Sequence, residues 1–131
     1  MTPMPGTGAP CARILVVEDE PQLRSLLADE LRDAGFGVLE ASSADDALKH
    51  IDAGLGVDLV FTDVQMPGTI DGIDLALMLH DRFPSVPVIV TSGNLGERCL
   101  NGVDRFVPKP YRLEAAVAIV FEALGPAERR R

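Results

Sequence analysis

The sequence predicts a three-layer, doubly wound α/β sandwich around a five-stranded parallel sheet. Two observations support this fold class: short, continuous apolar runs alternate with segments of helical periodicity, and five such runs occur within one chain of 131 residues. Alternating strands and helices form parallel βα units with right-handed crossovers, which cover both faces of a sheet with helices. Ligands of such sheets bind beyond the carboxyl ends of the strands, so the candidate functional residues are sought there.

The expected strands are apolar runs about as long as one buried strand. They lie at Ile14–Val17, Gly37–Ala41 (the weakest), Val57–Thr62, Val86–Thr91 and Val103–Val107.

Apolar residues recur every three or four positions in the segments that follow the first three runs, which predicts helices there. The first helix begins at Pro21 and ends before Gly35, since proline favours the first turn and glycine the position past the end. A second helix is expected around Ala44–Ala53. A third begins after Asp71, a candidate N-cap, and ends before Pro84.

The remaining two helical segments differ in strength. Residues Gly93–Gly102 contain three glycines and few apolar positions, so they predict at best a short or irregular fourth helix. The last helix is well defined from Leu113 to Leu124 and ends at Gly125. We expect one folded domain over residues 12–125, after a flexible leader (1–11, rich in proline and glycine) and before a tail (126–131).

The composition limits the possible partners. Apolar residues make up 47% of the chain and charged residues 24%, as in a soluble globular protein. Twelve basic against twenty acidic residues give a net charge of −8, which argues against non-specific binding to nucleic acid or to an anionic membrane surface. An acidic surface does favour cations.

The cellular compartment follows from the cysteines and the apolar runs. Cys11 and Cys99 make no disulfide framework and fit free thiols in a reducing cytosol. The first ten residues lack the pattern of a signal peptide, and the longest apolar run, Ala115–Phe121, is too short to span a bilayer. We therefore expect a cytoplasmic protein.

Polar residues lie at the carboxyl ends of four expected strands. They are Glu18, Asp19, Asp63, Thr91 and Lys109. Asp19 alone would equally suit a helix cap, but three carboxylates brought together repel one another and form a site for Mg²⁺. A hydroxyl and an ammonium beside them can bind the oxygens of a phosphoryl group.

These residues lie in motifs that resemble the receiver domain of two-component response regulators. The resemblance covers about residues 12–125 and rests on four motifs in order: Ile14–Glu20 (ILVVEDE), Asp63–Pro67 with Asp71-Gly72, Thr91-Ser92, and Lys109–Tyr111. It implies the flavodoxin-like strand order 2-1-3-4-5.

The resemblance also implies a role for each site residue. Asp63 would accept a phosphoryl group from a phosphohistidine of a sensor histidine kinase or a histidine phosphotransfer protein. Glu18 and Asp19 would hold Mg²⁺ together with Asp63 and the backbone carbonyl of Gln65. Such catalysis consists largely of positioning and electrostatics.

Three further positions match the family pattern. Lys109 would pair with Asp63 and then with the phosphoryl oxygens, and its bond to Pro110 would be cis. Thr91 would turn its hydroxyl toward the phosphoryl group, and Phe106 occupies the aromatic switch position.

The sequence departs from the family pattern in two places. The loop Pro67-Gly-Thr-Ile-Asp71-Gly72 is one residue longer than the family's Pro-x-x-Asp-Gly. The interval from Thr91 to Lys109 is 18 residues, shorter than usual, and the shortening falls on the glycine-rich segment of the fourth helix. The fourth helix, part of the family's common output surface, is therefore expected to be shortened or irregular.

Two other function classes call for residues that differ from those of a phosphoacceptor. A phosphatase with an aspartate nucleophile would need a second Asp two residues after Asp63, where this chain has Gln65. A degenerate receiver used as a phosphorylation-independent binding module would lack acceptor or metal carboxylates, and none is missing. No DNA-binding domain is expected, because seven residues follow the last helix. We expect a single-domain regulator that catalyses only its own phosphorylation and dephosphorylation, and that switches a protein-interaction surface or serves as a phosphate sink.

The last helix is apolar over most of its circumference. Beyond one apolar stripe, it also carries Ala115, Ala118, Ile119 and Phe121. A helix that is apolar all round is either deeply buried or faces a partner. We expect an interface here, for a homodimer or for an unidentified downstream target.

Overall fold

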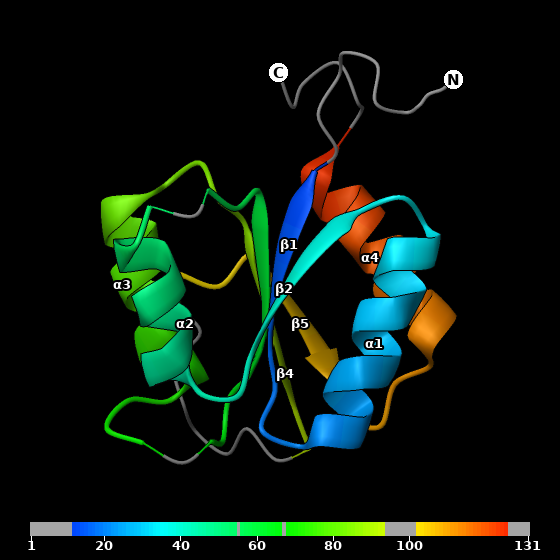
Figure 1. The fold of residues 1–131 in the computed structure, drawn as a ribbon, viewed down its shortest axis with the longest axis horizontal. Coiled ribbons are helices and arrows are strands. Elements are labelled where there is room, and N and C mark those ends of the chain that lie inside the picture. Colours follow the sequence, from blue (N-terminus) through cyan, green and yellow to red (C-terminus); the bar gives the residue numbers. More distant parts are fainter. Residues whose placement is uncertain (1–11, 55, 67, 94–101, 126–131) are drawn as a thin grey trace.

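The computed structural model describes residues 12–54, 56–66, 68–93 and 102–125 of the chain. A central sheet is flanked by helices on both sides (Figure 1). The strands are β1 (Arg13–Val17), β2 (Gly37–Ala41), β3 (Leu59–Asp63), β4 (Val88–Ser92) and β5 (Arg105–Pro108), and the helices are α1 (Pro21–Asp33), α2 (Ala44–Asp52), α3 (Gly72–Arg82) and α4 (Leu113–Leu124).

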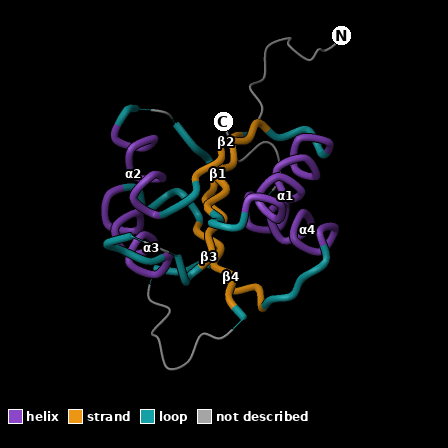
Figure 2. The backbone as a smooth tube through the Cα atoms, turned by 60° about the horizontal axis from the view of Figure 1, so that its bottom comes forward, coloured by secondary structure: helices purple, strands orange, loops and turns teal. Residues whose placement is uncertain are grey.

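All strand pairs are parallel, in the order β2-β1-β3-β4-β5. Figure 2 shows three layers, with α2 and α3 on one face of the sheet and α1 and α4 on the other. The predicted fold class and strand order are therefore confirmed.

Three strands lie slightly later in the chain than their apolar runs predict. The ladders of β3, β4 and β5 begin two residues after Val57, Val86 and Val103 and end one residue later than predicted. These three valines pack against the α2–α3 core from outside the ladder, and the amide of Val86 donates to the Phe83 carbonyl in a turn. Apolar burial therefore extends beyond the paired backbone, which periodicity alone does not reveal.

Local capping chemistry sets the starts of the helices as predicted. Proline 21 occupies the first turn of α1. The carboxylate of Asp71 accepts hydrogen bonds from the amides of Ile73 and Asp74, and Asp74 accepts one from the Asp71 amide, so a full capping box opens α3. Gly35, past the end of α1, has φ of +103°, a conformation that favours glycine.

Several expectations fall outside the described residues. They concern the flexible leader (1–11, with Cys11), the tail (126–131), and the weak fourth helix with Cys99 in residues 94–101. Among the helices that the structure describes, none combines the length and apolarity needed to cross a membrane.

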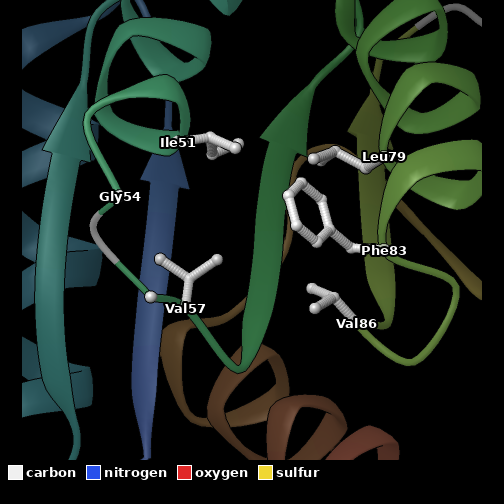
Figure 3. A pocket seen from close by; sticks show the side chains of 7 residues that line it. Ile51, Gly54, Val57, Leu79, Phe83 and Val86 are labelled. Carbon is white, nitrogen blue, oxygen red and sulfur yellow. The ribbon is translucent and has the colours of Figure 1, made fainter.

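The amino edge of the sheet holds an apolar pocket. A cavity of about 210 Å³ lies between the carboxyl ends of α2 and α3, lined by Ile51, Gly54, Gly56, Val57, Leu79, Phe83 and Val86 (Figure 3). Val57 and Val86 precede β3 and β4, so this pocket is at the opposite end of the sheet from the candidate site residues.

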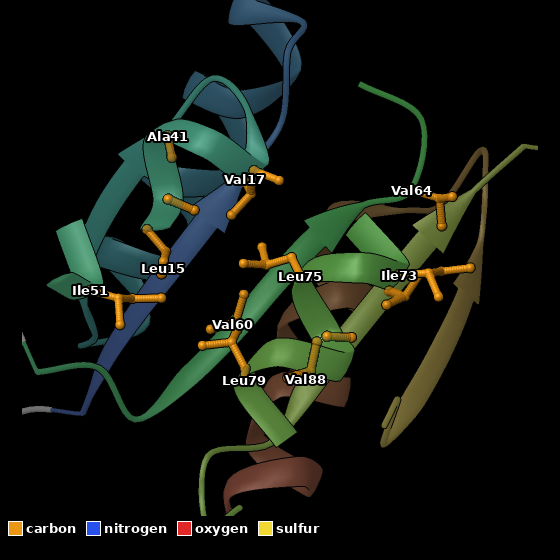
Figure 4. Close-up of a cluster of buried hydrophobic side chains, with 14 residues drawn as sticks. Leu15, Val17, Ala41, Ile51, Val60, Val64, Ile73, Leu75, Leu79 and Val88 are labelled. Carbon is orange, nitrogen blue, oxygen red and sulfur yellow. The ribbon is translucent and has the colours of Figure 1, made fainter. Parts of the chain in front are cut away.

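Two apolar cores fill the spaces between the layers. The larger core, between the sheet and α2–α3, includes Leu15, Val60, Leu75 and Val88 (Figure 4). The second lies on the α1–α4 side. Side chains alternate along each strand between the two cores, so strand position decides the face on which a polar residue emerges.

The last helix, α4, packs against the sheet through a narrower apolar face than its composition suggests. Ala116 and Val120 are fully buried, and Ile119 packs partly buried against the α1–α4 core. Phe121 is 45% exposed, although its ring lies 4.8 Å from that of Phe36. Ile119 is thus a core-contacting residue, and the outward apolar positions of α4 are Ala115, Ala118 and Phe121.

Candidate functional site

The topology gathers the predicted site residues at the carboxyl edge of the sheet. Glu18 and Asp19 directly follow β1, Asp63 ends β3, and Lys109 directly follows β5. Since all strands are parallel, these ends lie on one edge, and β1 and β3 are direct neighbours. The convergence that the sequence predicts is therefore present.

Lys109 links the two buried carboxylates. Its Nζ donates to Asp63 Oδ2 at 2.9 Å and to Glu18 Oε1 at 3.0 Å. The Glu18 and Asp63 side chains are only 5% and 9% exposed, against 23% for Lys109. A single ammonium thus offsets two buried negative charges.

The carboxylates form a group that can hold a cation. Within the described part of the chain, Glu18, Asp19 and Asp63 are the one group of metal-ligating residues that come together, with oxygens within 4.8 Å of one another. Glu18 and Asp63 are buried and Asp19 is exposed, so the group opens to solvent on one side. Mg²⁺ takes one or two carboxylates and keeps several waters, and this open, all-oxygen group fits that requirement.

Backbone and arginine contacts hold Glu18 in place. Its Oε2 accepts a hydrogen bond from the Glu20 amide at 3.1 Å, and its own amide donates to the Ala41 carbonyl at 3.0 Å. Arg24, one turn into α1, donates to the Glu18 carbonyl at 2.9 Å. Arg24 was not identified from the sequence, although a basic residue in the helix after an acidic strand end is a recognisable signal.

The electrostatics of Glu18 and Lys109 reflect burial together with crowding of charge. Burial raises the pKa of Glu18, the negative charge of Asp63 adds to that effect, and the hydrogen bonds from Glu20 and Lys109 only partly oppose it. Burial alone would lower the pKa of Lys109, but its hydrogen bonds to Asp63 and Glu18 outweigh burial and raise it. The site therefore favours positive charge.

Thr91 supplies a buried hydroxyl beside the acceptor position. Asp63 and Thr91 are register partners on β3 and β4. Asp63 and Thr91 come two residues after Phe61 and Ile89, whose side chains lie in the α1–α4 core. Side chains two residues apart in a strand point to the same face, so Asp63 and Thr91 both emerge on the α1–α4 face. Among the described residues, Thr91 Oγ1 is the one buried side-chain polar atom without a hydrogen-bond partner. Such a group is costly unless a ligand satisfies it.

The other sequence-predicted residues lie near the site to different degrees. Gln65 follows Asp63 by two residues and its side chain is exposed. Phe106 is paired with Val90 and packs partly buried against the α2–α3 core, whereas Thr91 is paired with Val107. The Lys109–Pro110 bond is cis, as the resemblance implied.

Two contacts at the site were not anticipated from the sequence. Gly72, the first residue of α3, lies so close to the backbone of Asp63 that a Cβ there would overlap the Asp63 carbonyl. The ring of Tyr111 meets that of Phe61 edge to face, with centroids 5.7 Å apart. Burial, followed by the charge of Glu18, raises the pKa of Tyr111 to about 12. In the sequence alone, a glycine after a helix cap does not reveal such a close approach to another strand; it becomes informative only when the fold is known.

Comparison with known proteins agrees with this geometry. The family model described as "Response regulator receiver domain" matches residues 14–121. The chain is 34% identical over 124 residues to the nitrogen assimilation regulatory protein NtrX of Azorhizobium caulinodans, covering 90% of this chain and 27% of that protein. It is 36% identical over 113 residues to the transcriptional regulatory protein BaeR of Escherichia coli, covering 82% of this chain and 46% of BaeR. The chain thus spans less than half the length of these relatives.

Solved structures share the fold. A CheY-like receiver domain protein from Methanospirillum hungatei superposes with a TM-score of 0.83 at 23% identity, over 92% of this chain and 97% of that one. The response regulator TrrA from Thermotoga maritima, solved in complex with Mg²⁺-BeF, has a TM-score of 0.76 and 30% identity, over 86% of this chain and 98% of TrrA. With matching motifs, topology and carboxyl-edge residues, the chain belongs to the family of response regulator receiver domains.

Proposed function

We propose that this receiver domain accepts a phosphoryl group on Asp63 in a Mg²⁺-dependent reaction. The observation that carries the proposal is the arrangement around one carboxylate: Asp63 lies within 4.8 Å of two further carboxylates and accepts a hydrogen bond from Lys109 at 2.9 Å. A buried acceptor flanked by cation ligands and a fixed ammonium suits phosphoryl transfer, which depends on positioning and charge stabilisation.

The cation site would comprise Glu18, Asp19, Asp63 and the backbone carbonyl of Gln65. When bound, Mg²⁺ would neutralise charge on the phosphoryl oxygens. Mg²⁺ commonly takes one or two carboxylates from protein and keeps several waters, so these three carboxylates would be enough to hold it, and its other ligands would be water and the phosphoryl group. The likeness to TrrA, which was solved with Mg²⁺-BeF, supports this assignment.

The reaction would form an acyl phosphate. An oxygen of the Asp63 carboxylate attacks phosphorus, a P–O bond forms, and the P–N bond to the donor histidine breaks. The histidine nitrogen keeps the electron pair and takes up a proton. Lys109 then moves its hydrogen bond from Asp63 to a phosphoryl oxygen, and the Thr91 hydroxyl donates to another.

The partners and output follow from the family. A sensor histidine kinase or a histidine phosphotransfer protein would supply the phosphoryl group in the cytoplasm. Phosphorylation would alter the surroundings of Thr91 and Phe106 and so switch a protein-interaction surface, or the domain would act as a phosphate sink. The outward face of α4, with Ala118 and Phe121, is the candidate surface for a downstream target or a second copy. No turnover of a separate substrate and no binding of nucleic acid are proposed.

The test is labelling by a small phosphodonor. Acetyl phosphate with Mg²⁺ is expected to add one phosphoryl group to the wild-type protein on intact-mass analysis, and chelation of Mg²⁺ is expected to prevent it. Asp63→Asn should not be labelled, and Asp58→Asn, an exposed carboxylate near the amino edge of the sheet, serves as the matched control that should be labelled normally. Equal labelling of wild type and Asp63→Asn would refute the assignment. Absence of labelling in a folded wild type would instead favour a phosphorylation-independent binding module.

A further inference from the structure

A contact outside the site holds the segment that follows the acceptor. Asp45, the second residue of α2, accepts two hydrogen bonds from Thr69, one from its amide to Oδ2 at 3.0 Å and one from its hydroxyl to Oδ1 at 2.6 Å. Thr69 lies six residues after Asp63, in the loop between β3 and α3. In Figure 1 this loop passes beneath the start of α2, at the lower edge of the sheet where the strands end.

Asp45 is not needed to cap its own helix. Ser43 Oγ accepts the hydrogen bond from the Asp46 amide at 3.0 Å, and Asp46 in turn accepts one from the Ser42 amide at 3.3 Å. Ser43 is thus the N-cap of α2, and Asp46 holds the residue that precedes the cap. Both oxygens of Asp45 accept a hydrogen bond from Thr69, and the Asp45 amide makes a weaker contact with its own carboxylate.

The residue before Thr69 is adapted to the same contact. Gly68 has φ of +121°, which side chains rarely adopt, and a Cβ at this position would overlap Oδ2 of Asp45. A glycine is required both by the backbone conformation and by the close approach of the carboxylate. Asp45, Gly68 and Thr69 thus form one contact, which we call the loop clamp.

The loop clamp acts on the part of the chain that carries a proposed cation ligand. The β3–α3 loop is fixed near its start by the Val64 amide, which donates to the Thr91 carbonyl at 3.0 Å, and at its end by the Gly72 amide, which donates to the Val64 carbonyl at 2.9 Å. Gln65 lies between these anchors, and the loop is one residue longer than the family pattern. An added residue adds conformational freedom, which a contact in the middle of the loop removes.

We propose that the loop clamp orients the Gln65 carbonyl toward the cation site, so that Asp45 and Thr69 are positioning residues for Mg²⁺ binding. The inference rests on the proposed function, because Gln65 is a ligand only if Glu18, Asp19 and Asp63 bind the cation. Neither Asp45 nor Thr69 belongs to the group of carboxylates that would hold the cation. Their effect passes through the loop backbone, in the way that outer partners orient metal ligands.

The central variant is Thr69→Val, which removes the hydroxyl while conserving shape and net charge. Calorimetric titration of the unphosphorylated protein with Mg²⁺ is expected to give a dissociation constant roughly tenfold higher than that of the wild type, the lower end of the effect of losing an outer partner. Thr69→Ser keeps the hydroxyl and should restore wild-type binding. Asp52→Asn is the matched control: it breaks the ion pair to Arg82 at the far end of α2 and should leave Mg²⁺ binding unchanged.

A second measurement separates positioning from a general loss of stability. Thr69 is exposed, so Thr69→Val should lower the unfolding midpoint only slightly, while amide hydrogen exchange accelerates at residues 65–66 and 68–70 and remains slow in β3. Labelling by acetyl phosphate should require more Mg²⁺ for half-saturation, yet reach the wild-type rate once Mg²⁺ is saturating.

The possible outcomes distinguish the two proposals. Unchanged Mg²⁺ affinity in Thr69→Val refutes the loop clamp as a positioning device, whatever happens to labelling. A Thr69→Val protein that is labelled more slowly at saturating Mg²⁺ but binds Mg²⁺ with unchanged affinity also refutes the positioning role. A wild type that binds Mg²⁺ but is never labelled at Asp63 contradicts the phosphoacceptor function and leaves the positioning role in place. A wild type that binds no Mg²⁺ contradicts both.

Discussion

Lys109 extends across β4 to donate a hydrogen bond to Asp63 at 2.9 Å, although Asp63 ends β3 and Lys109 follows β5, and these two strands are not neighbours in the sheet. Adjacent strands lie about 4.8 Å apart, so the contact crosses two strand spacings, a distance that a lysine side chain can cover. The same ammonium also reaches Glu18 on the far side of Asp63. One lysine therefore connects the ends of β1, β3 and β5.

Removal of this ammonium should destabilise the cation-free protein. In Lys109→Ala, Glu18 and Asp63 keep their burial and lose the positive charge between them. The free energy of unfolding is expected to fall by about 1–3 kcal/mol, and added Mg²⁺ should recover part of the loss. Urea denaturation with and without Mg²⁺ measures both. In an Asp63→Asn background the same substitution should cost less; an equal cost would show that the charge pair is not the cause.

The close approach of Gly72 to Asp63 predicts that Gly72→Ala is harmful. Alanine within a helix is ordinarily better than glycine by about 1 kcal/mol. Here the new methyl group would overlap the Asp63 carbonyl, and a net loss of about 1–3 kcal/mol is expected, together with slower labelling. Gly56→Ala, where the added methyl group meets open space, is the control and should be close to neutral. A Gly72→Ala protein as stable as the wild type would contradict the packing argument.

The unpartnered hydroxyl of Thr91 predicts opposite effects on stability and chemistry. Thr91→Val removes a buried donor that has no protein partner, so thermal unfolding should show stability maintained or raised by about 1 kcal/mol. Labelling by acetyl phosphate should slow, because a donor to the phosphoryl oxygens is gone. Thr91→Ser retains the hydroxyl and should label faster than Thr91→Val. A marked loss of stability in Thr91→Val would mean that the hydroxyl has a structural partner.

The loop clamp predicts how Asp45 titrates. Hydrogen bonds from the Thr69 hydroxyl and amide hold the pKa of Asp45 below its ordinary value, and Lys49 on the same helix adds a smaller attraction. Because the pKa is lowered in the folded state, the stabilising contribution is present above the unfolded pKa of about 3.9 and is lost as pH falls through the folded value. Carboxyl-carbon NMR should record a higher Asp45 pKa in Thr69→Val than in the wild type. Identical Asp45 titration curves in the wild type and Thr69→Val would show that the contact does not form in solution.

The outward apolar face of α4 leads us to expect self-association, which a single charge introduced on that face should disrupt. If a second copy docks on Ala118 and Phe121, then Ala118→Glu buries an unpaired carboxylate in the interface and should weaken the dimer. Ala53→Glu, on the opposite layer next to α2, is the matched control and should leave association unchanged. Sedimentation equilibrium with phosphorylated and unphosphorylated protein measures the oligomeric mass. A wild type that stays monomeric at all concentrations in both forms would exclude the homodimer.

The sequence alone determined the features that depend on near neighbours in the chain. The alternation of apolar runs and helical stripes predicted the layers, because side chains repeat every two residues in a strand and about every 3.6 in a helix. The N-cap at Asp71 and the proline at the start of α1 also follow from local hydrogen bonding and steric restriction. Glu18, Asp63 and Lys109 could be assigned to one edge because parallel strands all end on the same side.

The tertiary structure decided everything that depends on distances between different helices, strands and loops. Lys109 bridges two carboxylates, Gly72 lies against the Asp63 carbonyl, Asp45 holds Thr69, and Ile119 faces the core. Each of these contacts joins elements whose separation is set by the packing of whole helices against the sheet. A local pattern specifies which face a residue occupies, whereas the angle and distance between packed elements decide which atoms finally meet.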